Sequence, residues 1–269
     1  MNRLIINKIV LALSTLSALI GIGFLFWILI TLSCKGLSGI HWTTFSDDLV
    51  EGGIRNLLVG QFMMAIIATL VAVPLGLMAG IYLQEYGQGS RFAVVIRNLS
   101  DVMTSAPSIV IGVFVFAVLV DPVGSFNGWA GIAALAIMML PIIIGTTDNM
   151  LALVPRELRE AGIALGGSKQ KIILQVVLRA ARAGVTTGIL LSFARIIGET
   201  APLLFTSANN QFFTTDLSGQ FPSLTVSIYN LATYPDEASR ELAWVASFVL
   251  TAMVLLINLA GRYLTREKR

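Results

Sequence analysis

Long apolar stretches alternate with short polar segments along the whole chain. Six of these stretches reach or approach the roughly 20 apolar residues that a helix needs to cross a bilayer. They lie at about 9–32, 57–83, 102–120, 129–147, 184–206 and 242–264. Five contain no charged residue before their last positions, whereas the fifth has Arg195 and Glu199 in its middle. The pattern predicts an all-α, polytopic membrane bundle of six transmembrane helices, forming a single domain over residues 1–269.

The composition agrees with a membrane protein and excludes several other classes. Hydrophobic residues make up 56% of the chain and charged residues 12%, against about 25% charged in an ordinary soluble domain. One cysteine, Cys34, and one histidine, His41, exclude a disulfide framework and a multi-histidine metal site. The sequence contains no GxxxxGK[ST] phosphate loop and no nucleophile–base set. We therefore expect no metal, no cofactor, no nucleic-acid partner and no enzymatic activity in this chain itself.

Basic residues are distributed unevenly between the polar segments. If the N-terminus is cytoplasmic, the start of the chain, residues 84–101, residues 148–183 and the tail hold 14 of the 18 Lys and Arg. The outer loops then hold three basic and eight acidic residues. Because short cytoplasmic loops are enriched in Lys and Arg, we expect both termini in the cytoplasm.

The longest predicted cytoplasmic segment, 148–183, contains the pattern of a short amphipathic helix. Pro155 suits its first turn, where a missing N–H is no loss. Leu158, Ala161 and Leu165 share one face by helical spacing. A rigid helix held between two spans could dock into a groove on a cytoplasmic protein, although an interfacial helix without a partner has the same pattern.

The fifth span carries an ion pair at membrane depth. Arg195 and Glu199 are four residues apart, which puts them on one helix face about 6 Å apart along the axis. An unpaired charge there costs at least about 2.5–3.5 kcal/mol, so the two should face the protein interior or a water-filled path. Pro202 cannot donate to the carbonyl of Gly198, so we expect the helix to kink beside Glu199.

Two interpretations of this pair follow from the residues, and both stay open. Arg195 presents a planar fork of donors that suits an oxyanion, and Glu199 would partly neutralise it between transport events. Alternatively, the two form a structural ion pair that locks the bundle.

The run Glu160-Ala161-Gly162, with Gly166 after three further residues, resembles the EAA---G signature of ABC-importer permeases. The chain departs from that pattern at Arg179, where Pro is usual. The resemblance implies the type I ABC importer permease fold. It also implies that this helix inserts into a cleft of a separate ATPase subunit and transmits its movement, which would make residues 148–183 a coupling loop.

The stretch from Ala194-Arg195 through residues 198–204 resembles the phosphate importer permeases, the PstA type rather than its homologue PstC. The resemblance implies a place in the bacterial inner membrane and a substrate pathway for inorganic phosphate that includes Arg195, Glu199 and Thr200. It further implies a homologous permease of the PstC type, two ATPase subunits of the PstB type and a periplasmic phosphate-binding protein of the PstS type.

Three other functions remain as alternatives. The chain could be an ABC permease for another oxyanion. It could be a self-contained secondary transporter, which would predict inverted repeats or carboxylates in several spans, whereas Glu199 alone qualifies. A scaffold or sensor subunit would need neither a coupling helix nor an intramembrane Arg.

Overall fold

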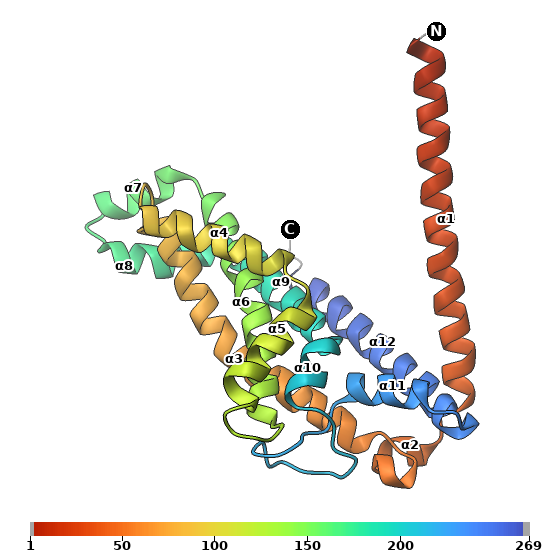
Figure 1. Cartoon of the computed structure of the whole chain (residues 1–269). Helices are drawn as coiled ribbons and strands as arrows, with labels where there is room; N and C mark the ends of the chain where they lie inside the picture. Colours follow the sequence, from red (N-terminus) through yellow and green to blue (C-terminus); the bar gives the residue numbers. More distant parts are fainter. Residues whose placement is uncertain (1–2, 266–269) are drawn as a thin grey trace.

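The computed structural model describes residues 3–265, whose regular structure is entirely helical (Figure 1). Residues 1–2 and 266–269 of the predicted domain, with the basic residues Arg266, Lys268 and Arg269, lie outside the described residues. The helices in chain order are α1 (Arg3–Ser38), α2 (Trp42–Ser46), α3 (Arg55–Glu85), α4 (Arg91–Ser105), α5 (Ser108–Val115), α6 (Gly128–Ala152), α7 (Arg156–Ala164), α8 (Lys169–Ile172), α9 (Leu178–Ile197), α10 (Ala201–Thr206), α11 (Leu224–Thr233) and α12 (Glu237–Thr265).

Three shorter elements complete the described structure. A 3-10 turn, η1, follows α2 on the outer side, and two π-helical segments, η2 and η3, continue α5 and precede α9. Their bounds are Leu49–Glu51 for η1, Phe116–Val120 for η2 and Ile173–Val177 for η3.

Four predicted spans correspond to continuous helices. The spans predicted at 9–32, 57–83, 129–147 and 242–264 lie within α1, α3, α6 and α12 respectively. Each helix is longer than its predicted span and continues at both ends into the neighbouring polar residues. With the segment Lys169–Ile197, these are the five helices among residues 3–265 that are long and apolar enough to cross a membrane.

The third predicted span, 102–120, is not one straight helix. Its first residues belong to the end of α4, which meets the segment Ser108–Val120 at an angle of 106°. The bend lies at Ala106-Pro107, where both residues have extended backbone angles. Proline lacks a donor and disfavours a helical conformation in the residue before it, so this dipeptide ends α4 and begins α5. The bent pair supplies the sixth candidate crossing.

The fifth predicted span, 184–206, is interrupted near its outer end. α9 ends at Ile197, Gly198 occupies its C-cap, and α10 begins at Ala201 with Pro202 in its first turn. Proline suits that turn because the first N–H groups of a helix have no intrahelical acceptor. The interruption therefore lies at Gly198–Thr200, directly beside the ion pair predicted from the sequence.

Close packing of α3 on α6 forms the centre of the bundle. A Cβ atom at Gly76 would lie 2.7 Å from Ile143 Cγ2, and one at Gly80 would lie 2.5 Å from Thr147 Cβ. Small residues let membrane helices approach closely, which increases van der Waals contact in the absence of a hydrophobic driving force. The two helices therefore form one tightly packed pair.

We expect Gly80→Val to destabilise this pair strongly, because the added side chain overlaps Thr147 Cβ and lies 3.0 Å from the Ile144 carbonyl on α6. Overpacking of a tight core costs typically about 1–3 kcal/mol. Thermal unfolding of the detergent-solubilised protein should show a lower midpoint. Gly145→Val is the matched control on α6, because a Cβ at Gly145 meets nothing within 4 Å. An equal midpoint for both variants would contradict this account of the packing.

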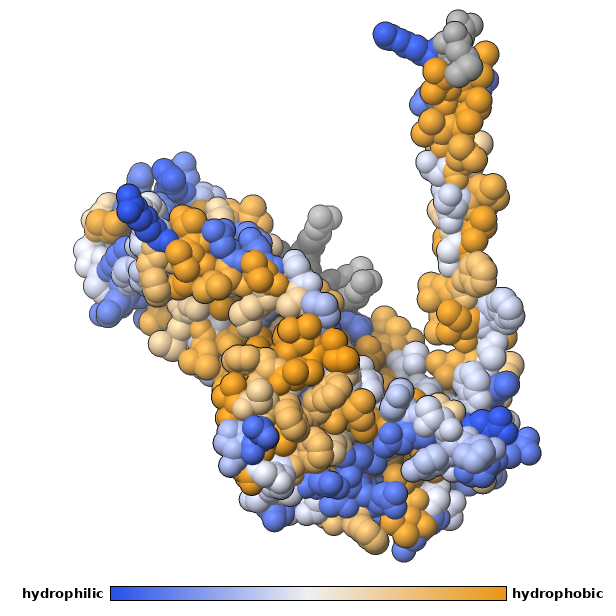
Figure 2. Space-filling view, in the orientation of Figure 1, coloured by the Kyte–Doolittle hydropathy of each residue, from blue (hydrophilic) through white to orange (hydrophobic). Residues whose placement is uncertain are grey.

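The helix α1 stands apart from the body of the bundle over most of its length (Figure 1). Its most apolar window has no residue buried by the rest of the chain. It packs on α12 at its outer end, where Gly36 lies against Phe248 and Lys35 Nζ lies 4.8 Å from the Trp244 ring centre. Figure 2 shows an almost entirely apolar α1 and an apolar band across the body between two polar ends. This distribution suits a bilayer around the chain.

Candidate functional site

The predicted coupling residues gather on α7 and the turn that follows it, at the end of the bundle that the basic residues place in the cytoplasm (Figure 1). Glu160, Ala161 and Gly162 lie on the second half of α7, and Gly166 follows its C-cap. The apolar face expected from the spacing points away from the bundle into the cytoplasm. Leu158 is 42% exposed and Leu165 90% exposed. The chain itself therefore leaves an apolar ridge open on its cytoplasmic end.

Gly166 ends α7 in a conformation that favours glycine. Its φ is +78°, in the left-handed region. The Gly166 N–H donates to Ile163 O at 2.9 Å, and the Gly167 N–H donates to Gly162 O at 3.0 Å. These two bonds form a Schellman cap, which satisfies the last carbonyls of the helix. The glycine of the signature therefore fixes where the outward ridge ends.

If α7 docks on a separate ATPase subunit, as the resemblance of its signature implies, Gly166→Val should weaken that attachment by about five- to thirtyfold, because the left-handed region costs a residue with a side chain roughly 1–2 kcal/mol. Co-purification of the ATPase subunit with the tagged permease measures the effect. Gly89→Val is the matched control, since Gly89 has the same left-handed φ, +77°, in the turn between α3 and α4. Equal loss in both variants would show that the strain acts on the whole fold and not on the coupling helix.

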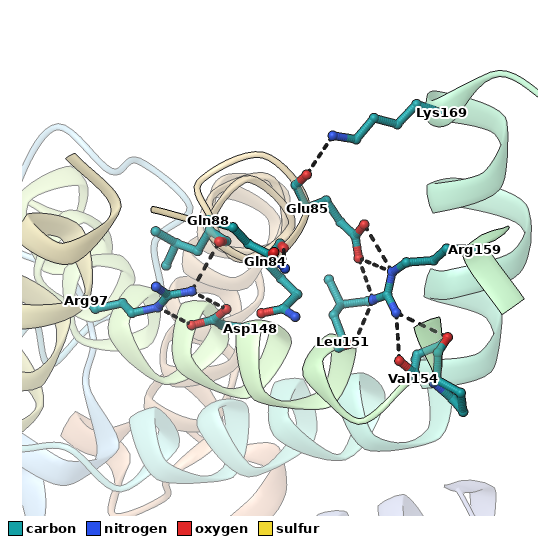
Figure 3. A network of polar contacts seen from close by, with 11 residues as sticks. Gln84, Glu85, Gln88, Arg97, Asp148, Leu151, Val154, Arg159 and Lys169 are labelled. Atoms are coloured by element: carbon teal, nitrogen blue, oxygen red, sulfur yellow. Dashed lines mark hydrogen bonds and ion pairs between the residues drawn. The ribbon is translucent and has the colours of Figure 1, made fainter. Parts of the chain in front are cut away.

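Arg159 holds α7 against the ends of two spans, as Figure 3 shows. Its Nη2 donates to Glu85 Oε1 at 2.7 Å and to Leu151 O at 2.9 Å, and its Nη1 donates to Val154 O at 2.7 Å. Glu85 is the last residue of α3, and Leu151 belongs to the last turn of α6. One guanidinium thus forms an ion pair with the end of α3 and donates to two carbonyls, one in the last turn of α6 and one just after it.

The same end of the bundle contains an open polar cavity of about 430 Å³. Arg156, Arg159 and Glu160 of α7 line it together with Glu85 and Lys169. A second ion pair lies nearby, where Arg97 of α4 contacts both carboxylate oxygens of Asp148 at 2.7 and 3.1 Å (Figure 3). Arg97 also donates to Leu83 O at 3.1 Å. These contacts hold α4 against α3 and α6, on the cytoplasmic side of the bend at Ala106-Pro107.

The predicted pathway residues Arg195, Glu199 and Thr200 lie together at the break between α9 and α10. Arg195 Nε is 3.5 Å from Glu199 Oε1. The Arg195 side chain is 45% exposed and the Glu199 side chain 16% exposed. Thr200 is the N-cap of α10, and its backbone carbonyl accepts the Leu204 N–H at 3.0 Å. The ion pair is therefore formed within this chain, but the chain leaves nearly half of the Arg195 side chain uncovered.

Side chains from two other helices satisfy carbonyls that the break frees. In a continuous helix the Ile197 carbonyl would accept the Ala201 N–H. Instead it accepts Gln61 Nε2 at 3.0 Å, and the Glu199 carbonyl accepts Thr225 Oγ1 at 2.7 Å. Gln61 is fully buried. Backbone carbonyls without helical partners need other donors at membrane depth, and Gln61 and Thr225 supply them here. These hydrogen bonds stabilise the break between α9 and α10.

Sequence reasoning predicted the Arg195–Glu199 pair and the helix at α7, but not the side chains from other helices that contact them. Gln61 is visible in the sequence as a polar residue in an apolar span, although nothing there indicates its acceptor. Arg159 and Glu85 are 74 residues apart. Their pairing depends on how the cytoplasmic ends of α3 and α6 meet, which no local pattern specifies.

Comparisons with known proteins place the chain in a family and show which solved structures share its fold. A family model described as "Binding-protein-dependent transport system inner membrane component" matches residues 72–269. The "Phosphate transport system permease protein PstA" of Pasteurella multocida is 44% identical, with 97% of this chain and 95% of the relative covered. The "Probable phosphate transport system permease protein PstA" of Methanocaldococcus jannaschii is 34% identical, with 98% and 95% covered.

Solved structures of ABC transporters share the fold. The alginate ABC transporter, in complex with its alginate-bound periplasmic protein, aligns with a TM-score of 0.72 at 12% identity, covering 97% of this chain and 94% of that chain. The inward-facing MetNI methionine ABC transporter aligns with a TM-score of 0.62 at 20% identity, covering 80% and 93%. These likenesses establish the type I importer architecture predicted from the coupling signature. With the family match and the full-length relatives, they show that this chain belongs to the binding-protein-dependent transport system inner membrane components and, among them, to the PstA permeases.

Proposed function

We propose that this chain is a transmembrane permease subunit of an ATP-driven importer of inorganic phosphate in the inner membrane. The single observation that carries the proposal is a cationic side chain beside a break in a spanning helix, in a chain of the PstA family. Arg195 stands in the last turn of α9 with its guanidinium partly paired to Glu199. A guanidinium fork matches the oxygens of a tetrahedral anion, and a nearby carboxylate limits how tightly the anion is held.

The exposure of Arg195 supports a shared pathway. With 45% of its side chain uncovered at membrane depth, Arg195 would face lipid if the chain stood alone. Exposing a charge to lipid is costly, so a second protein surface or a water-filled path should cover it. A homologous permease of the PstC type would supply that surface. The pathway, with Thr200 on its rim, would then lie between the two permeases.

The outward ridge of α7 supports attachment of an ATPase. Leu158 and Leu165 are apolar, exposed and held on a short helix whose end is fixed by the Gly166 cap. Two ATPase subunits of the PstB type, one for each permease, would receive such helices and hydrolyse ATP. A periplasmic phosphate-binding protein of the PstS type would deliver the anion to the outer side. ATP binding would draw the coupling helices together and open the bundle outward, and hydrolysis would reset it.

Uptake of labelled phosphate by cells tests the proposal. The cell's own copy is deleted and replaced by this chain, with the other transporter subunits present, and uptake is measured at micromolar phosphate. Restored phosphate uptake that excess sulfate does not reduce is the expected result. If the chain reaches the membrane and restores sulfate uptake but not phosphate uptake, the substrate is another oxyanion and the phosphate assignment is wrong.

A further inference from the structure

The cytoplasmic end of α3 is attached to the coupling region by two separate contacts. Arg159 of α7 holds the Glu85 carboxylate through Nη2 at 2.7 Å and Nε at 3.1 Å. Lys169, the first residue of α8, donates to the Glu85 carbonyl at 2.7 Å, and its Nζ lies 4.1 Å from the centre of the Tyr86 ring. Figure 3 shows both basic side chains converging on this one residue. The segment before and the segment after the Gly166 turn are therefore tied to the same point.

The Glu85–Arg159 contact is well protected from water for a pair at a membrane surface. The Glu85 side chain is 7% exposed and the Arg159 side chain 19% exposed. Bidentate, charge-assisted hydrogen bonds in such a setting fix relative geometry more firmly than an exposed ion pair does. A displacement of α7 should therefore displace the end of α3 as well.

A second group of polar contacts of α3 lies near its outer end, at the break in the fifth span, where Gln61 is buried. Gln61 donates to Ile197 O at 3.0 Å and accepts Ser223 Oγ at 3.0 Å and the Leu224 N–H at 3.1 Å. Its side chain has one acceptor oxygen and one donor group, and both are used. Ile197 is two residues from Glu199, so Gln61 fixes the backbone that carries the ion pair.

Between these two contacts α3 is one uninterrupted helix. Gln61 and Glu85 are separated by about 36 Å along the axis at 1.5 Å per residue. Pro74 lies inside this stretch, where it removes one helical hydrogen bond. The helix is braced there by close contact with α6, at Gly76 and Gly80. A braced helix transmits displacement along its length with little internal change.

The covalent route from α7 to the same break is less regular. It runs through the turn at Gly166-Gly167, the short helix α8 and the π-helical segment η3 before α9 begins. A π-helical turn departs from the regular ladder of hydrogen bonds and often marks a place where a helix adjusts. The route through α9 therefore contains more points at which a displacement of α7 can be absorbed.

We propose that α3 carries the movement of the coupling helix to the broken fifth span, with Glu85 and Gln61 as the positioning residues at its two ends. The inference rests on the proposed function, because it assumes that α7 is moved by an ATPase and that the Arg195–Glu199 site is the pathway. In this arrangement ATP-driven displacement of α7 pulls the cytoplasmic end of α3. Gln61 then shifts the Ile197 carbonyl and, with it, the backbone at Glu199.

The test measures phosphate transported per ATP hydrolysed by the complete complex in proteoliposomes. The variants are Glu85→Gln, Gln61→Met and the double variant. Two controls are chosen on and beside the same helix. Thr69→Val loses a hydroxyl that donates to Ala65 O of α3 and contacts Met139 Sδ of α6 at 3.6 Å, and Gln88→Ala loses an amide that donates to Gln84 O. Each single variant should lower the transport ratio by about tenfold while receptor-stimulated ATP hydrolysis persists. The controls should keep the wild-type ratio.

The double variant and one conservative variant make the result decisive. If Glu85 and Gln61 act in the same mechanical connection through α3, either substitution alone should disrupt it. The double variant should then transport as much phosphate per ATP as either single variant. Multiplied losses in the double variant, or an unchanged ratio in Glu85→Gln, would overturn the proposal. Arg159→Lys keeps the charge but loses the fork, so an intermediate ratio is expected even if Gln61→Met fails to fold. A wild-type complex that hydrolyses ATP without moving phosphate would instead refute the proposed function.

Discussion

Replacement of Leu165 by Asp should abolish coupling while leaving the permease folded. Leu165 is 90% exposed and occupies the C-cap of α7, so a charge there disturbs no packing within the chain. If the residue is an anchor in the ATPase cleft, burying an unpaired carboxylate there costs about 2 kcal/mol or more, which is a loss of affinity of about thirtyfold. Co-purification of the ATPase and phosphate uptake should both fall to background.

The matched control for Leu165→Asp is Val123→Asp, because Val123 is also apolar and 65% exposed but lies on the predicted outer side. This control should keep both ATPase attachment and uptake. Normal ATPase attachment in Leu165→Asp would mean that α7 is an interfacial helix without a partner, the alternative that the sequence left open.

Replacement of Arg195 should reduce phosphate uptake in proportion to the geometry that is lost. Arg195→Ala removes the charge and the fork, and hydrogen bonds to a charged group are worth about 1.5–3 kcal/mol each, so uptake should fall by at least about tenfold. Arg195→Lys keeps the charge without the planar fork and should give a smaller loss. The measurement is the initial rate of uptake of labelled phosphate at equal membrane levels of the two variants.

Arg240→Ala provides the control for Arg195, because Arg240 is an exposed arginine in the first part of α12 on the outer side. Uptake in this control should match the wild type. Wild-type uptake in Arg195→Ala would reduce the Arg195–Glu199 contact to a structural ion pair, with the family membership unaffected.

Hydrophobic length was sufficient to predict most of the membrane helices. The apolar runs within α1, α3, α6 and α12 are continuous, and each forms one helix. At Ala106-Pro107 length alone failed, because the apolar run passes through a dipeptide whose backbone cannot continue a helix. Pro107 thus decided the course of the third span, which apolar length alone did not indicate.

The break in the fifth span could be predicted from the local sequence, but its hydrogen-bond partners could not. The sequence indicated a kink beside Glu199 from Pro202, and the structure has its break at Gly198–Thr200. The partners that make this break tolerable, Gln61 and Thr225, come from two other helices. Which carbonyl a buried glutamine reaches depends on the packing of α3 against α9, which is a tertiary property.

The same limit applies to the coupling region. The glycine at 166 could be placed from the signature, and its left-handed φ of +78° explains why glycine suits that position. The outward direction of Leu165 and the inward direction of Arg159 on the same short helix depend on where α3 and α6 end. Where these two helices end depends on the packing of the whole bundle. The Arg159 contacts that hold α7 could therefore not be predicted from the sequence.

The central claim, that this chain moves phosphate as one part of an ATP-driven importer, is tested most directly in proteoliposomes. The chain is reconstituted with the second permease and the ATPase subunits, and uptake of labelled phosphate is followed with the phosphate-binding protein outside the vesicle and ATP inside. The account predicts phosphate accumulation that requires ATP, the binding protein and every subunit. Phosphate accumulation by this chain alone, driven by an ion gradient without ATP, would contradict it and identify a secondary transporter.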